Sequence, residues 1–198
     1  MIGRHGVINW AESEQECYEW TVEIIQKADQ YLAQHDKGEM TFGGIRYPEL
    51  NEATRRAALV EILPWLRCQV SSDKRLFATV QDDKMMRYFV NSEDVVRLSE
   101  LGTSCPDHFL RNKIKPMYVP WNPHHQSLDA LKELILEGLD RYRQNYSAYY
   151  ERCKLDDSPA LRNTNPSVVL IPGLGMIAWG KTRVRAVELL SSIIVHLK

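Results

Sequence analysis

Apolar residues recur at helical spacing early in the chain. A stripe from Cys17 to Leu32 keeps a helical period, and Ser13 followed by Glu16 is the capping-box pattern that begins helices. The pattern predicts an amphipathic helix that buries one face. A second helix is predicted from a cap at Asn51 through Leu66, and Pro64 should kink or shorten it.

Later stretches predict a mixture of strands and helices. Residues 76–80 and 85–90 are interpreted as two strands of a hairpin with its turn at residues 81–84. The other predicted elements are helices at 92–101 and 106–112, an extended run at 117–119, a long helix at 128–153, a strand at 168–171 and a closing helix from Thr182. This mixture predicts an α/β fold in which helices cover a sheet.

The beginning of the chain resembles its end. Moving the sequence by 169 positions aligns six identical residues, among them a glycine and a tryptophan, which are structurally restrictive. The identical pairs are Gly6 and Gly175, Ile8 and Ile177, Trp10 and Trp179, Glu19 and Glu188, Ile24 and Ile193, and Ile25 and Ile194. We expect both regions to share a unit of strand, turn and helix. In the first copy, the strand that leads into this unit is expected to be shortened.

Composition narrows the function. The 198 residues are 44% hydrophobic and 26% charged, as in a soluble globular chain of one domain or slightly more. The 25 basic and 26 acidic residues nearly balance, which disfavours nucleic acid or an anionic membrane as partner. No apolar run approaches the roughly 20 residues that cross a bilayer. The absence of a secretory signal pattern and the widely spaced cysteines predict reduced thiols and a cytoplasmic location.

Two local motifs suggest ligands. Residues 175–182 fit the G-x-x-x-x-G-K-[ST] pattern, so Gly173 to Thr182 is a candidate site for a nucleotide or a sugar phosphate, although Met176, Ile177 and Trp179 look like core residues of a strand. The overlapping glycines only weakly imitate a dinucleotide fingerprint. Another candidate is a zinc site, although its spacing matches no closed four-ligand set. Its donors would be Cys105, His108, His124 and His125.

Several segments together resemble a known family. They are residues 4–10, 102–111, 113–116, 149–153 and 171–176, of which 102–111 and the Ile-Pro-Gly-Leu-Gly-Met sequence at 171–176 are the most specific. The chain resembles the middle portion of the bifunctional rhamnulose-1-phosphate aldolase/short-chain dehydrogenase proteins of the class II aldolase/adducin family. The resemblance implies a layered α/β fold with a mixed, largely antiparallel sheet. It also implies a zinc-dependent retro-aldol lyase of carbohydrate metabolism, in which three histidines and a glutamate hold the metal.

The chain differs from that family at the positions where metal ligands are expected. The resemblance implies that His5 corresponds to the last zinc-binding histidine, but the other ligands should lie upstream of it. In the second copy, Gly102-Thr103-Ser104 stands where a His-x-His pair could sit, and Leu174 takes the position of His5. We therefore assign no catalytic residue and expect His5 to be the only metal ligand. We also assign no nicotinamide chemistry, because NAD would belong to the absent dehydrogenase part.

We therefore expect residues 1–37 to be the end of one aldolase-like unit and residues 38–198 to be a second, degenerate unit. The chain is expected to be inactive alone, with a structural or assembly role. Its expected partners are copies of itself or the remaining aldolase and dehydrogenase portions. Two alternatives stay open: a zinc-dependent lyase completed by another chain, and the phosphate-binding module at residues 173–182.

Overall fold

A four-stranded sheet forms the centre of the protein. The computed structural model describes residues 6–72, 74–102 and 113–186. The strands lie in the order β1 (Phe77–Gln81), β4 (Gly175–Gly180), β3 (Val168–Ile171) and β2 (Met117–Tyr118). The pairs β1·β4 and β4·β3 are antiparallel, whereas β2·β3 is parallel. The predicted α/β fold with a mixed, largely antiparallel sheet is confirmed.

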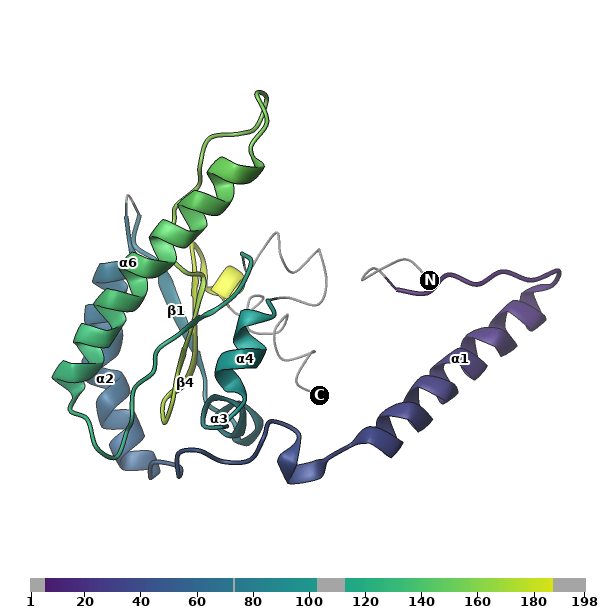
Figure 1. Cartoon of the computed structure of the whole chain (residues 1–198), viewed down its shortest axis with the longest axis horizontal. Coiled ribbons are helices and arrows are strands. Elements are labelled where there is room, and N and C mark those ends of the chain that lie inside the picture. Colours follow the sequence, from purple (N-terminus) through teal and green to yellow (C-terminus); the bar gives the residue numbers. More distant parts are fainter. Residues whose placement is uncertain (1–5, 73, 103–112, 187–198) are drawn as a thin grey trace.

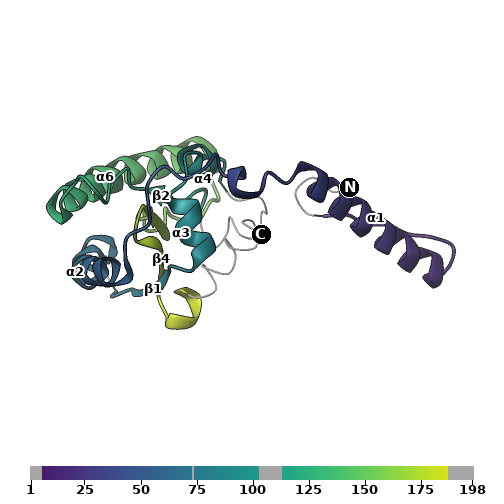
Figure 2. The same cartoon turned by 90° about the horizontal axis from the view of Figure 1, so that it is seen from below.

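Helices cover both faces of this sheet. On one face lie α2 (Glu52–Val70) and α6 (Leu128–Cys153), and on the other lie α3 (Lys84–Val90) and α4 (Val95–Glu100) (Figures 1 and 2). Strand β4 shows why both faces need cover. Its Ile177 and Trp179 pack in the core beneath α2 and α6, while Met176 and Ala178 pack in the core beneath α3 and α4. Alternate side chains of a strand point to opposite faces, so a continuous apolar run here indicates a sheet enclosed on both sides.

Helix α2 continues through its proline. The Asn51 side chain accepts a hydrogen bond from the Thr54 N–H at 2.8 Å, as the predicted cap requires. The helix runs to Val70 with Pro64 inside it, so the expected shortening is wrong. The buried positions Ile62, Leu66 and Val70 lie on both sides of the proline, and their packing outweighs the backbone hydrogen bond that Pro64 cannot make.

The predicted hairpin at residues 76–90 is also wrong in its second half. Residues 85–90 belong to helix α3, whose cap is Asp83; the Asp83 carboxylate accepts a hydrogen bond from the Met86 N–H at 2.9 Å. The antiparallel neighbour of β1 is β4, from the far end of the chain. The buried residues Met86, Phe89 and Val90 are spaced i, i+3 and i+4, as on one face of a helix. Their packing outweighs the β-forming character of residues 85–90.

The remaining elements agree with the sequence wherever they are described. These are α4, β2, α6, β3 and the start of the closing helix at residues 183–186. The predicted helix at 106–112 and the rest of the closing helix lie outside the described residues. Cys17, Cys68 and Cys153 are free thiols, as expected. Within the described ranges, no helix is long and apolar enough to span a membrane.

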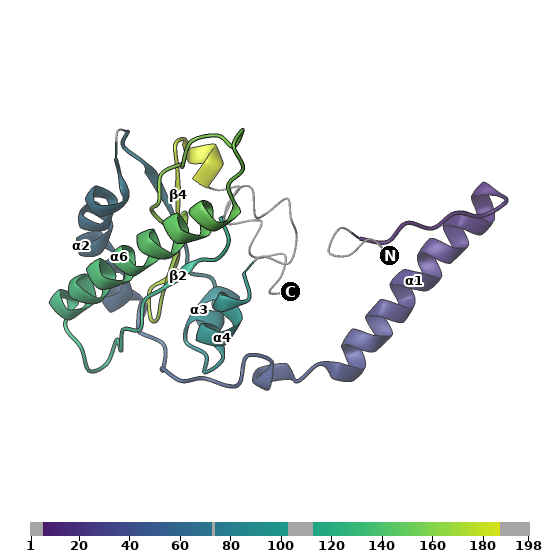
Figure 3. The same ribbon diagram turned by 45° about the horizontal axis from the view of Figure 1, so that its top comes forward.

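The first helix stands away from this body. Helix α1 (Glu14–His35) begins at the predicted cap, where the Ser13 hydroxyl accepts a hydrogen bond from the Glu16 N–H at 3.2 Å. None of its residues is buried, so the expectation that it buries a face is wrong for this chain. Figures 1 and 3 show α1 well apart from the sheet, beyond the short 3-10 helix η1 (Gly38–Met40).

Candidate functional site

The P-loop-like segment forms part of the sheet. Residues 175–180 are strand β4, paired with β1 on one side and with β3 on the other. A P-loop binds phosphate because successive backbone N–H groups curl around it, whereas a strand between two neighbours uses those groups in its ladders. Lys181 is exposed after the strand, and Thr182 caps the next helix by accepting a hydrogen bond from the Arg185 N–H at 3.2 Å. The geometry therefore argues against a phosphate cradle at Gly173 to Thr182.

The glycines of this segment are used for close packing. A Cβ added to Gly173 would lie 2.9 Å from Pro123, one at Gly175 would lie 2.4 Å from the Gln81 carbonyl oxygen, and one at Gly180 would lie 2.5 Å from the Ala186 nitrogen. The space that a phosphate would need beside each glycine is taken by the chain's own atoms. Gly173 and Gly175 also have φ values of +75° and +106°, which favour glycine.

The structure does not assemble the histidines and cysteines into a metal site. His5, Cys105 and His108 lie outside the described residues. The Nε2 atom of His124 is 2.8 Å from the Pro48 carbonyl oxygen, so this ring joins two loops, and His125 is exposed. In the described ranges, no three His, Cys, Asp or Glu side chains come close enough to hold a metal ion. The described residues do not fit the zinc that the resemblance implies.

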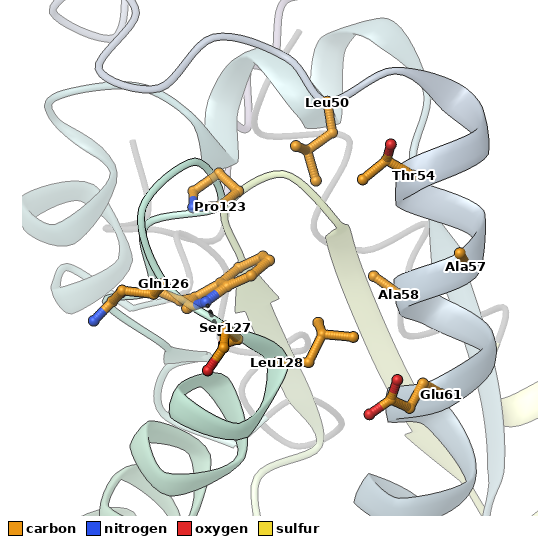
Figure 4. A pocket seen from close by; sticks show the side chains of 10 residues that line it. Leu50, Thr54, Ala57, Ala58, Glu61, Pro123, Gln126, Ser127 and Leu128 are labelled. Carbon is orange, nitrogen blue, oxygen red and sulfur yellow. Dashed lines mark hydrogen bonds between the residues drawn. The ribbon is translucent and has the colours of Figure 1, made fainter.

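A pocket of about 340 Å³ opens between the N-terminal half of α2 and the loop that leads into α6. Figure 4 shows Ala58 and Leu128 bordering it from the two helices, with Leu50 and Pro123 at one end and Glu61 at the other. The remaining lining residues are Thr54, Ala57, Trp121, Gln126 and Ser127. Most of this lining is apolar, as in sites that bind small molecules or an apolar side chain of a partner.

Local hydrogen bonds hold the loop before α6 in place. The Trp121 indole N–H donates to the Ser127 carbonyl at 3.2 Å, and the Ser127 hydroxyl caps α6 by accepting from the Ala130 N–H at 3.2 Å. The Asn122 N–H donates to the Gln126 side chain at 2.7 Å. These bonds make the pocket wall a defined part of the fold.

The β3–β4 turn closes the same end of the molecule. The Gly173 N–H donates to the side-chain oxygen of the fully buried Asn91 at 2.7 Å, and Gly173 packs against Leu50 and Pro123, which line the pocket. The Ile-Pro-Gly-Leu-Gly-Met segment thus packs, through Gly173, behind two residues of the pocket wall.

The charged groups at the pocket are already paired. The Glu61 carboxylate lies 2.8 Å from the Lys132 ammonium group, which also lies 3.2 Å from Asp129. Among the residues that line the pocket, none forms a nucleophile–base pair, and Glu61 is the single carboxylate. Such a site can bind a ligand but offers no evident acid–base chemistry.

A more strongly perturbed group lies next to α6. The Lys113 ammonium group donates to the carbonyl oxygens of Asn163 and Asn165 and lies 4.4 Å from the centre of the Tyr146 ring. Burial lowers the pKa of Lys113 to about 8. Because its donors are used to tie the 163–165 loop to α6, Lys113 has a structural role.

Sequence reasoning did not find the pocket. Its lining comes from residues 50–61 and 121–128, which are far apart in the chain and meet only through the packing of α2 and α6 on the sheet. One available signal was Trp121 between two prolines, since a tryptophan in a rigid loop commonly anchors it in a core.

These features define a three-layer α/β domain whose glycine-rich segment closes the sheet. The chain belongs to the family described as the second domain of class II aldolases, whose family model matches residues 57–192. It is also similar to YuxG of Bacillus subtilis strain 168, named as an uncharacterized oxidoreductase, with 36% identity over 182 residues. That match covers 92% of this chain but only 26% of YuxG, so the chain spans about a quarter of that relative. The comparison with solved structures found no match.

Proposed function

We propose that this chain is a non-catalytic part of a sugar-phosphate class II aldolase, and that it is inactive alone. Its role is structural: it supports or joins the units of a longer aldolase/dehydrogenase protein acting on a ketose 1-phosphate of the rhamnulose type. The family membership and the coverage of a quarter of YuxG support this proposal.

The observation that carries the proposal is the use of the glycine-rich segment. The backbone at Gly173, Gly175 and Gly180 lies very close to other atoms of the chain. A Cβ built on these glycines would lie 2.9, 2.4 and 2.5 Å, respectively, from the nearest of those atoms. A segment that closes a sheet in this way serves the stability of the domain. The pocket beside it has Glu61 already paired with Lys132, which favours binding over catalysis.

A retro-aldol assay tests the proposal directly. The full chain is incubated with rhamnulose 1-phosphate and with increasing zinc, while bound zinc and released aldehyde are measured. We expect neither stoichiometric zinc nor turnover, because one ligand such as His5 cannot hold a catalytic zinc ion.

The matched variants are His5→Ala and His125→Ala, the second being an exposed histidine of the body. Stoichiometric zinc with turnover that is lost in His5→Ala but kept in His125→Ala would overturn the proposal. That result would favour the alternative, a lyase whose remaining ligands come from another chain.

A further inference from the structure

Two aligned parts of the described structure share a glycine of positive φ, a helix cap and a helix start. Gly6 and Gly175, which align at the offset of 169 residues, both have positive φ, at +128° and +106°. The caps Ser13 and Thr182 align at the same offset, and each accepts a hydrogen bond from the N–H three residues later at 3.2 Å. The helices then begin at residues 14 and 183, which also align. The resemblance therefore extends from sequence to backbone conformation and capping.

In both copies the segment before the helix contacts the aligned fourth residue of that helix. In the second copy, Gly180 packs against the backbone of Ala186, in the first turn of its helix. In the first copy, the Asn9 side chain donates to the Cys17 carbonyl at 2.9 Å, and Cys17 aligns with Ala186. In the first copy, the segment before α1 is thus held against the first turns of that helix by a hydrogen bond.

The two copies differ completely in what covers them. Ile177 and Trp179 are 0% and 4% exposed, whereas the aligned Ile8 and Trp10 are 61% and 77% exposed. In the second copy the cover is known: β1 pairs on one side of the strand, β3 pairs on the other, and α2 and α6 pack above it. The described part of the first copy therefore exposes the apolar residues that align with the inner strand β4, in a segment that is not itself a strand.

Helix α1 extends the same uncovered surface. Its stripe of large apolar side chains is exposed along the whole helix. The members are Trp20, Ile24, Ile25, Tyr31 and Leu32. Contiguous apolar surface of this kind on a soluble protein marks a contact with another part of an assembly.

We propose that residues 6–35 dock as the closing strand and helix of a second sheet, and that the partner is an aldolase-like α/β unit whose sheet lacks its own strand at that place. In the complex, residues 7–10 pair on both sides, as β4 does here, and Ile8 and Trp10 become buried. This proposal rests on the proposed function, because it identifies the partner that the assembly role requires.

A second copy of this chain fits the surface less well. Its sheet already holds β4 between β1 and β3, so the described part of a copy offers only the outer edges of β1 and β2, each on one side of an added strand. A unit without its closing strand offers two edges at once. Chain for such a unit exists beside this region in YuxG, since the match spans only 26% of that protein.

The test mixes the full chain with a defined probe, YuxG from which the region that this chain matches has been removed. Amide hydrogen exchange of residues 6–35 and the fluorescence of Trp10 are followed. We expect exchange to slow by about tenfold or more in the mixture, because paired strands exchange far more slowly than uncovered backbone. The Trp10 emission should shift to shorter wavelength.

Two substitutions make the test specific. Ile8→Asp should abolish both changes, whereas Val60→Asp, on the exposed side of α2, should leave them unchanged. A probe that is soluble only when co-expressed with the chain, and not with the Ile8→Asp variant, supports the same conclusion.

Three results overturn the docking proposal. They are unchanged exchange with the soluble probe, protection of residues 6–35 that rises with the concentration of this chain alone, and a probe that is insoluble with and without the chain. Failure of the proposed function would be seen elsewhere, as zinc binding and retro-aldol turnover by the chain alone.

Discussion

The repeated unit allows one substitution to be made at two equivalent places. Gly175→Ala puts a Cβ 2.4 Å from the carbonyl oxygen of Gln81, a backbone atom held in the β1–β4 pairing, at a residue with φ of +106°. Gly6→Ala introduces the same atom at φ of +128°, with no atom of the described residues within 4 Å apart from its chain neighbours. The substitutions are chemically identical but differ in what surrounds them.

The expected magnitudes follow from these surroundings. An alanine held at positive φ costs about 1–2 kcal/mol, and forcing a backbone shift in a packed sheet costs about 1–3 kcal/mol more. Gly175→Ala should therefore lower the free energy of unfolding by about 2–5 kcal/mol, a large part of the roughly 5–15 kcal/mol of a typical domain. Gly6→Ala should change it by less than about 0.5 kcal/mol, because the uncovered segment can adopt another φ.

Urea unfolding followed by circular dichroism and tryptophan fluorescence measures both values, with coincident transitions as the check on two-state behaviour. Equal destabilisation by the two substitutions would refute the claim that residues 6–35 contribute little to the stability of this chain. A stable Gly175→Ala variant would refute the close approach of β4 to Gln81.

Other predictions concern the core, an ion pair and pH. Ile135→Ala, at a fully buried position of α6, should lower the free energy of unfolding by about 2–5 kcal/mol, whereas Ile25→Ala on α1 should change it by less than about 0.5 kcal/mol in urea titrations. Asp82→Ala removes the 3.0 Å ion pair of the mostly buried Arg55 and leaves its hydrogen bond to the Leu50 carbonyl; because Asp82 is partly exposed, we expect a loss of about 1–2 kcal/mol in the same assay. The lowered pKa of Lys113, about 8 against 10.5, means that the unfolded chain binds more protons between those pH values. The contribution of this group to stability should therefore rise from pH 8 to 10, and Lys113→Met should flatten the rise in unfolding curves taken across that range.

The sequence was sufficient for elements whose signals are local. Helix α6 has both a serine cap and an uninterrupted apolar stripe, and β3 is a short β-branched run, so both were predicted at the residues where they occur. The run at 85–90 mixes β-forming residues with helical spacing, and the choice between them depends on β4 being the neighbour of β1.

The candidate site was less accessible to sequence reasoning. The pocket is made by two segments some seventy residues apart, which only the packing of α2 and α6 brings together. Helix α1 shows the opposite limit: its apolar stripe predicts a buried face, but none of its residues is buried in the described structure. Amphipathic periodicity reports that a helix needs a partner, not where the partner is.

The order of strands in the sheet has a consequence for how the protein folds during synthesis. Phe77 pairs with Gly180, so the ribosome must add about a hundred residues after β1 before its neighbour exists. Until then β1 and β3 have no strand between them, and their apolar side chains remain in contact with water. Pairing between strands that are far apart in the sequence slows folding and leaves aggregation-prone intermediates. We expect nascent chains that end before residue 175 to depend on chaperones, whereas chains that include β4 can complete the sheet.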